Sequence, residues 1–256
     1  MNIDIQKINA IAIEAGNAIL EVYNDEQAAS SISYKSDNSP LTLADMRSND
    51  VIVAGLENAY PDIPILSEES AGVDFETRKN WDYYWCVDPL DGTKEFINRN
   101  GEFTVNIALI HQNTPILGVI YVPCKETIYY GDPNGSFKQI TGGLAVQIQA
   151  NEKQSDWVSV GSRSHADGSE AEYLSAFPIK EQLSAGSSLK FCLLAEGLAQ
   201  VYYRKGPTME WDTAAGHAIA IQSGAIMQGI NGEAFVYNKP DLLNPGFVCR
   251  VPFEGH

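Results

Sequence analysis

Apolar residues recur at helical spacing at the start of the chain. Over residues 3–23 they fall every three or four positions, which predicts an amphipathic first helix. Residues 27–40 are polar and carry turn residues, so we expect one strand around Ile32 followed by a loop. A second helix, with Asp45 in its first turn, is predicted to end near Ala59.

Short apolar and β-branched runs then predict a series of strands. Residues 83–87 are an aromatic and aliphatic run typical of a buried strand. We expect it to end at Asp88-Pro89, because proline has no N–H to donate within a central sheet. The polar stretch 72–81 before it is expected to be a loop. The other strands predicted here are 63–66, 102–110, 116–122 and 127–130, the middle two forming a hairpin across Asn113-Thr114-Pro115.

The pattern weakens over residues 139–150, which predicts a link between two parts of the chain. We therefore expect a first part over residues 1–140 and a second over 141–256. The second part is predicted to hold strands at 157–160 and 201–204, a helix over 189–197 and a small-residue helix that opens at Trp211.

Composition and charge restrict the function. The chain has 256 residues, 44% of them hydrophobic, which is enough for a sizeable core. Its net charge of −16 argues against a basic surface that binds a nucleic-acid polymer. The same charge repels a phosphate substrate, so any phosphate site would need a bound divalent cation or local basic residues.

The four cysteines form no C-x-x-C pair, and each adjoins apolar residues. They are therefore expected to be reduced core thiols, as in a cytoplasmic protein. The start of the chain lacks the pattern of a signal peptide, and no apolar run approaches the ~18 residues of a membrane-spanning helix. The sequence predicts no particular oligomeric state.

Acidic residues at the ends of predicted elements are the candidate chemistry. Asp88 and Asp91 flank a tight turn, and Gly92 and Thr93 follow with N–H groups that could face an anion. Two carboxylates beside exposed amides form a place where Mg²⁺ and a phosphate can meet. Aspartate, proline and glycine are also ordinary turn residues, so a plain turn is an equal alternative for this stretch alone.

Each of the other acidic candidates also has a structural interpretation. Glu68, after a strand, could be a solvated loop residue, and Asp45 and Asp212 could cap helices. Taken together, Glu68, Asp88, Asp91 and Asp212 are oxygen donors without an organised set of cysteines or histidines, which indicates a hard cation such as Mg²⁺. The residues alone thus favour metal-dependent phosphate chemistry and identify no substrate.

Small and basic residues in the second half could bind an anion. Residues 186–190 open a predicted helix whose first N–H groups are free, and Arg204-Lys205 adds positive charge. His165 lies in a loop after a strand. A helix cap and solvated side chains are the alternatives for these residues.

Several of these stretches resemble the signatures of the inositol monophosphatase superfamily. They are Glu68-Glu69, residues 88–93 (DPLDGT) and residues 211–216 (WDTAAG). Further runs are similar to the bacterial 3′(2′),5′-bisphosphate nucleotidases within that superfamily, namely residues 94–96, 100–110, 162–165, 186–192 and 243–247.

The resemblance implies a layered αβαβα sandwich of the α/β (α+β) class. It implies a Mg²⁺-dependent, Li⁺-sensitive phosphatase that converts adenosine 3′,5′-bisphosphate, a small nucleotide left over from sulfate assimilation, into AMP and phosphate. It also implies a location in the cytoplasm, with the cytoplasmic face of the inner membrane as an alternative. Two other functions stay open: an inositol monophosphatase, and a non-catalytic nucleotide- or metal-binding relative.

The resemblance further implies roles for individual residues. Metal would be held by Glu68, Asp88, the carbonyl of Leu90, Asp91 and Asp212. Thr93 would orient the attacking water and pass a proton to Asp45, with Glu68 also in the catalytic set. The substrate would contact Glu68, Leu90, Asp91, Gly92, Thr93 and Asp212, and its second phosphate would contact His165, Ser187, Lys190 and Arg204.

Overall fold

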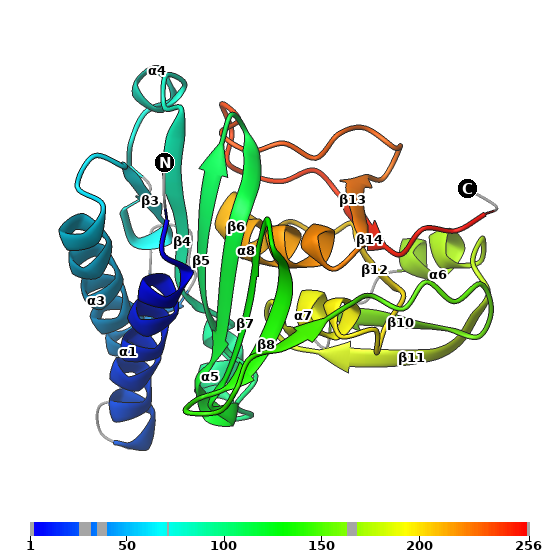
Figure 1. The fold of residues 1–256 in the computed structure, drawn as a ribbon, viewed down its shortest axis with the longest axis horizontal. Helices are drawn as coiled ribbons and strands as arrows, with labels where there is room; N and C mark the ends of the chain where they lie inside the picture. The colour runs from blue at the N-terminus through cyan, green and yellow to red at the C-terminus, as the bar shows by residue number, and fades with distance from the viewer. Residues whose placement is uncertain (1–2, 26–31, 35–39, 71, 163–167, 255–256) are drawn as a thin grey trace.

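A computed structural model describes residues 3–25, 32–34, 40–70, 72–162 and 168–254. These residues form alternating layers of helices and sheets (Figure 1). Helices α1 (Ile5–Asn24) and α3 (Leu43–Ala59) cover one face of a large sheet, and α7 (Leu189–Ala195) and α8 (Glu210–Gln222) lie between this sheet and a smaller one. Helix α6 (Gly168–Leu174) lies beyond the smaller sheet. The expected layered sandwich is confirmed.

The two outer helices follow from their sequence pattern and caps. In α1 the buried residues recur at helical spacing, and the side chain of Asp4 accepts a hydrogen bond from the N–H of Gln6. In α3, Thr42 and Asp45 form a capping box, in which each side chain accepts from the backbone of the other. Asp45 therefore has the structural role that its position predicts.

The described residues form a seven-stranded sheet in the order β3-β4-β5-β6-β7-β8-β9. Strand β3 is parallel to β4, and the remaining neighbours are antiparallel. The strands are β3 (Ile65–Ser67), β4 (Tyr83–Asp91), β5 (Thr104–His111), β6 (Thr114–Val122), β7 (Thr127–Asp132), β8 (Gly135–Ile140) and β9 (Val146–Ile148).

Alternation along β4 decides which face of the large sheet receives each side chain. Trp85 and Val87 pack into the core beneath α1 and α3, whereas Tyr84 and Cys86 pack into the core shared with α7 and α8. Since successive side chains of a strand point to opposite faces, Asp88 falls on the α8 side.

The prediction that β4 ends at Asp88-Pro89 is wrong. The strand continues to Asp91, and its pairing with β5 shifts between Asp88 and Asp91. Such a β-bulge leaves residues unpaired, so the missing N–H of Pro89 breaks no ladder bond there. The Ser48 hydroxyl donates to the Pro89 carbonyl at 2.7 Å and ties this bulge to α3.

A five-stranded sheet forms in the second half of the described chain, in the order β11-β10-β12-β14-β13. Strand β10 is parallel to both β11 and β12, and β14 is antiparallel to β12 and β13. The strands are β10 (Trp157–Ser162), β11 (Ile179–Ala185), β12 (Val201–Arg204), β13 (Ile226–Gly229) and β14 (Phe247–Arg250).

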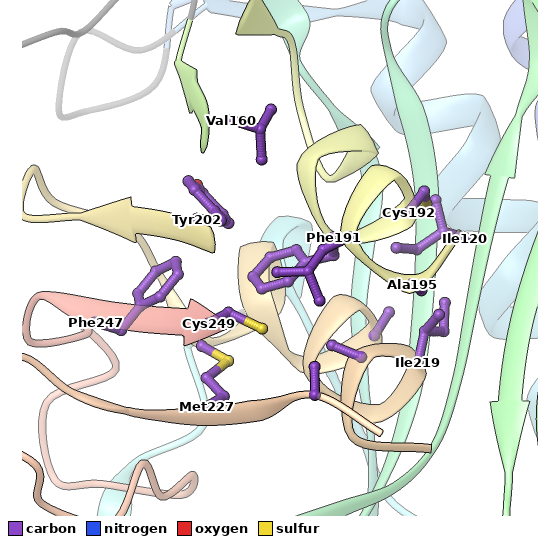
Figure 2. Packing of buried hydrophobic residues seen from close by; sticks show 14 of the residues in the cluster. Ile120, Val160, Phe191, Cys192, Ala195, Tyr202, Ile219, Met227, Phe247 and Cys249 are labelled. Atoms are coloured by element: carbon purple, nitrogen blue, oxygen red, sulfur yellow. The ribbon is translucent and has the colours of Figure 1, made fainter. Parts of the chain in front are cut away.

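The layer between the sheets is packed through small residues. A Cβ on Gly118 of β6 would lie 2.3 Å from the Ala215 carbonyl oxygen, and one on Gly216 would lie 2.1 Å from the Phe191 ring. Helix α8 can therefore approach the large sheet and α7 closely. Figure 2 shows Phe191 from α7 facing Tyr202 and Phe247 of the small sheet.

Most predicted elements are confirmed, with shifts of a few residues at their ends. Short elements of weak pattern were missed: α4 (Phe75–Arg78) inside the predicted loop, α5 (Thr93–Ile97) after the aspartate motif, and β8, β9, α6, β11 and β13. A small β1–β2 pair joins Ile32–Tyr34 and Pro40–Thr42, as the strand expected near Ile32 suggests. The division at residues 140 and 141 stays a prediction; β9 extends the large sheet to Ile148.

Three of the four cysteines are buried and free, as expected, but Cys124 is free and exposed, so its predicted place in the core is wrong. It is the middle residue of the short 3-10 turn Pro123–Lys125, which leaves its side chain at the surface. None of the helices in the described ranges is both long and apolar enough to cross a membrane.

Candidate active site

The turn between β4 and α5 (Thr93–Ile97) holds the motif residues in a compact arrangement. The N–H of Leu90 donates to the Asp88 carboxylate at 3.1 Å. Gly92 has a φ of +92°, a left-handed conformation that strongly favours glycine. A Cβ on Gly92 would also lie 3.2 Å from the Cβ of Ser187, so the turn can approach the start of α7 closely.

Asp212 reaches this turn from a distant part of the chain. Its carboxylate accepts from the N–H of Met209 at 2.9 Å, which fixes it in the first turn of α8. The Ser188 hydroxyl lies 2.6 Å from the Asp91 carboxylate and 3.0 Å from the Asp212 carbonyl oxygen. Ser188 thus bridges the two segments that the sequence predicted would converge.

Two polar residues of this bridge were missed at the level of sequence. The side-chain amide of Asn106 donates to Ser188 at 2.9 Å and to the Asp91 carboxylate at 3.2 Å, and Thr104 donates to Asn106 at 3.0 Å. An asparagine within the apolar run of β5 was the available signal, since a buried amide needs partners. For Ser188, the sequence showed only that it lies among small residues at the start of a predicted helix, which does not predict its contact with Asp91.

The electrostatics show a concentration of like charge. Burial and then the neighbouring carboxylates of Glu68, Asp91 and Asp212 raise the pKa of Asp88 well above its usual value. Burial, followed by Asp91, raises the pKa of Asp212 to about 8. Glu68, from the short turn Glu68–Ser70 after β3, raises both.

This donor set fits a divalent cation. Several carboxylates repel one another in a buried site, and a bound hard cation removes that repulsion and restores their charged forms. As they lie, no three described His, Cys, Asp or Glu side chains meet the geometry of a metal site. The oxygens are instead held by backbone and hydroxyl donors, as at Asp212 and Asp91.

Thr93 and Asp45 lie side by side across α5 and α3. The Thr93 hydroxyl is 3.5 Å from one oxygen of Asp45, at the limit of a hydrogen bond. The other oxygen accepts from the N–H and the hydroxyl of Thr42 at 2.7 and 2.6 Å. Asp45 is buried, so a single carboxylate both caps α3 and faces Thr93.

Lys190 and Arg204 are cations near the acidic cluster. Lys190 is buried, donates to the carbonyls of Ala185 and Ser187, and lies over the Tyr202 ring. Burial lowers its pKa to about 8, with Asp91 acting in the opposite direction. Arg204 lowers the pKa of both Lys190 and Asp212, which places its charge in the same region.

The other two predicted anion-binding residues are Ser187 and His165, and the structure describes only the first of them. The Ser187 hydroxyl donates to the Glu102 carbonyl at 2.6 Å, so it faces the protein backbone. His165 lies outside the described residues. The structure therefore brings Glu68, Asp88, Leu90, Asp91, Gly92, Thr93, Asp45, Asp212, Lys190 and Arg204 into one region, while their roles stay predictions.

A layered sandwich with an acidic cluster at a bulged strand end defines a class of phosphatase-like proteins. The chain belongs to the inositol monophosphatase family, whose model matches residues 2–250. Within the family the chain is similar over nearly its whole length to proteins named "3'(2'),5'-bisphosphate nucleotidase CysQ". The relative from Salmonella typhimurium is 48% identical over 248 residues, which cover 96% of this chain and 99% of that protein.

Further relatives agree with this placement. The CysQ protein of Escherichia coli K12 is 47% identical with the same coverage. The crystal structure of CysQ from Bacteroides thetaiotaomicron has a TM-score of 0.82 and 41% identity, and the match covers 94% of each chain. An inositol monophosphatase from Anabaena shares the fold at a TM-score of 0.72 and 19% identity, over 96% of this chain and 88% of that one.

Proposed function

We propose that the protein is a Mg²⁺-dependent phosphatase that hydrolyses adenosine 3′,5′-bisphosphate to AMP and phosphate. The observation that carries the proposal is the cluster of Glu68, Asp88, Asp91 and Asp212 beside Thr93, in a chain about half identical to bisphosphate nucleotidases. The resemblance to bisphosphate nucleotidases implies that this substrate is a by-product of sulfate assimilation and that the reaction takes place in the cytoplasm.

The metal ligands would be the carboxylates of Glu68, Asp88, Asp91 and Asp212 and the carbonyl of Leu90. A Mg²⁺ ion held by these residues would supply positive charge to the transferring phosphoryl group and would lower the pKa of a bound water. Asn106 and Ser188 fix the orientation of Asp91, and the N–H of Met209 fixes that of Asp212.

Thr93 and Asp45 form the route for the proton of the attacking water. The Thr93 hydroxyl accepts a proton from the water as it donates its own to Asp45. The new bond joins the water oxygen to phosphorus, and the bond from phosphorus to the ribose oxygen breaks. The freed ribose oxygen takes up a proton from solvent water and becomes the hydroxyl group of AMP. Asp45 suits this role because its second oxygen is held by Thr42, which fixes the carboxylate toward Thr93.

The turn and the cations would hold the two phosphates. The N–H groups of Gly92 and Thr93 donate to the oxygens of the reacting phosphate, where negative charge develops. Lys190 and Arg204 supply the positive charge that the second phosphate needs in an acidic protein. Ser187 and His165 belong to the same proposed subsite by resemblance.

A comparison of substrates tests the proposal. Phosphate release should be measured for adenosine 3′,5′-bisphosphate and for inositol 1-phosphate, each with Mg²⁺ and with added Li⁺. We expect a much higher kcat/KM for the nucleotide and inhibition by Li⁺. Preference for inositol 1-phosphate would make the protein an inositol monophosphatase, and nucleotide binding without turnover would make it a non-catalytic relative.

A further inference from the structure

A cavity lies on the face of the small sheet that α6 covers. Its volume is about 480 Å³. One wall is formed by the end of α6 and the residues up to Phe177, and the other by β13, the residues after it and Arg250 of β14. Aromatic, amide and charged side chains line it, among them Glu172, Tyr173, Phe177, Gln228, Asn231 and Arg250. None of these residues belongs to the proposed active site.

The strand register shows that this cavity is separate from the catalytic cluster. On β12, Tyr202 packs against Phe191 of α7, whereas the next residue, Tyr203, stacks on Tyr173 of α6 with ring centroids 4.5 Å apart. Val201 pairs with Arg250, so Arg250 shares the face of Tyr203. The side chain of Arg250 therefore faces α6, and the small sheet separates it from α7.

Arg250 is the unusual feature of this cavity. It is only 6% exposed, and the described residues place no carboxylate within ion-pairing distance of its guanidinium. One nitrogen, Nη1, donates to the Val251 carbonyl at 3.1 Å, and the group lies 5.8 Å from the centre of the Phe177 ring. A buried charge without a counter-charge is unfavourable, so a fold that keeps one indicates an anionic partner.

The remaining donors of Arg250 suit a carboxylate. Its Nε and Nη2 atoms have no hydrogen-bond acceptor among the described residues, and together they form one edge of the planar fork. Such an edge binds both oxygens of a carboxylate. The positive charge of Arg250 also partly offsets the rise that burial causes in the pKa of Tyr173, which shows that the two groups are close.

The other side chains define the rest of the ligand. Tyr173, stacked on Tyr203, and the buried Phe177, stacked on Trp157, line the cavity with ring centroids 5.8 Å apart. They form an apolar wall against which an apolar body can pack. Glu172 lines the cavity as an exposed acid, so a single negative charge is favoured over a phosphate dianion. Gln228 and Asn231 can add amide donors.

We propose that this cavity binds a small organic carboxylate, whose carboxylate group pairs with Nε and Nη2 of Arg250 and whose apolar or aromatic body packs against Tyr173 and Phe177. The site is independent of the proposed phosphatase activity. It lies at the opposite face of the small sheet from Asp212, and substrate chemistry requires none of its residues.

Benzoate, benzamide and inorganic phosphate are suitable probes of the full-length, Mg²⁺-loaded protein. Each is titrated while the backbone amide signals are followed by NMR. We expect benzoate to shift the signals of Tyr173, Phe177, Gln228 and Asn231 in a saturable way. Benzamide has the same shape without the charge and should bind at least about 10-fold more weakly, because a charge-assisted pair is lost.

Variants assign the binding to Arg250. Arg250→Met should weaken benzoate binding by about 10-fold or more. Arg99→Met is a matched control, since Arg99 also lies over a ring, that of Tyr23, and donates to a backbone carbonyl, yet is exposed. Ala176→Trp fills the exposed rim of the cavity and leaves Arg250 in place, so it decides the matter if Arg250→Met does not fold.

Three results would overturn the proposal. Equal affinity for benzoate and benzamide would show that the charge of Arg250 is not used. Unchanged benzoate binding in both Arg250→Met and Ala176→Trp would place the ligand elsewhere. Tighter binding of phosphate than of benzoate at these signals would replace the carboxylate with a phosphate ligand.

Discussion

Asp88 is a buried carboxylate with three acidic neighbours. It is 2% exposed, and its pKa is raised by burial and by the charges of Glu68, Asp91 and Asp212. A buried carboxylate among other carboxylates weakens the fold. Its presence therefore indicates that a function or a ligand requires it, since a neutral side chain would otherwise make the fold more stable. The individual residues of the cluster can therefore be tested by activity and stability together.

Replacement of Asp88 by asparagine should abolish turnover and preserve the fold. Loss of a metal ligand removes several kcal/mol of charge stabilisation, so kcat/KM should fall at least about 100-fold. In EDTA the thermal midpoint should be unchanged or higher, because one member of a repelling cluster becomes neutral. Asp62→Asn, at an exposed position, is the control. Release of phosphate by Asp88→Asn at the wild-type rate would remove Asp88 from the metal site.

The Thr93 hydroxyl should matter to kcat more than to KM. Thr93→Val keeps the shape of the side chain and removes the proton route to Asp45, so kcat should fall by roughly 10²–10⁴-fold. Thr93→Ser, which restores the hydroxyl, should recover most of the activity. Steady-state kinetics of both variants decide this point, and an active Thr93→Val would leave the residue with a structural role only.

At the scale of secondary-structure elements, α8 has two tasks. Its first turn presents Asp212 to the bulge of β4, and its body fills the layer between the sheets. The close approach of α8 to the large sheet sets the position of Asp212 relative to Asp91. Substitution of Gly118, which packs against α8, and protonation of the buried His217 of α8 should therefore both lower the stability of the protein.

Gly118→Ala should destabilise the protein. The added Cβ would meet the Ala215 carbonyl at 2.3 Å, so β6 and α8 must separate, which costs roughly 1–3 kcal/mol. Thermal or urea unfolding measures the loss. Gly72→Ala is the matched control, because a Cβ there has no neighbour within 4 Å. Equal stability of Gly118→Ala and wild type would show that the helix has room to move.

His217 should make the stability fall in mild acid. Burial lowers its pKa from 6.5 to about 4, so the folded protein keeps it neutral while the unfolded chain binds a proton between these values. The contribution of neutral His217 to the free energy of unfolding is fully present above pH 6.5. This contribution should fall by about 3 kcal/mol as the pH decreases to 4.

Urea unfolding from pH 7 to 4 in wild type and His217→Gln isolates this effect. The variant should lose about 3 kcal/mol less over the interval, since glutamine binds no proton. His111→Gln, at a partly exposed position, serves as the control. Parallel pH curves for wild type and His217→Gln would contradict the buried neutral imidazole.

At the scale of the whole molecule, an acidic chain of net charge −16 is expected to act on a substrate that is itself an anion. The long-range field opposes binding, so the site depends on a cation that the protein gathers locally. The site also joins the two halves of the chain, since Asp88 and Asp91 come from the large sheet and Asp212 from α8. Metal binding should therefore couple activity to the stability of the whole fold.

Removal of metal should abolish phosphate release and lower the thermal midpoint. Mg²⁺ at 100 times its Kd stabilises a folded protein by about 2.7 kcal/mol, provided that it does not bind the unfolded chain. The midpoint of wild type should thus rise with Mg²⁺, and that of Asp88→Asn should not. The same ionic strength of NaCl is the control. Full activity in EDTA would rule out the metal-dependent proposal.

Strong local patterns predicted much of the fold. The helical spacing in α1, the β-branched runs of β5 and β6 and the aromatic run of β4 are set by neighbours along the chain, so their elements appear where expected. Short elements such as β8, β9 and β13 lack such patterns and form because a sheet edge is available for pairing. Pro89 was misjudged because a bulge, not the end of a strand, accommodates its missing N–H.

The acidic ligand set was also predicted from residue types and motifs, since oxygen donors at strand ends and helix starts are local features. Only the tertiary structure decided that Asp212 lies beside Asp91 and that Asn106 and Ser188 orient the Asp91 carboxylate. It also decided that Arg250 is buried without a counter-charge from any residue the structure describes. The physical reason is that hydrogen bonds, burial and charge repulsion between distant segments depend on distances that the order of residues does not contain.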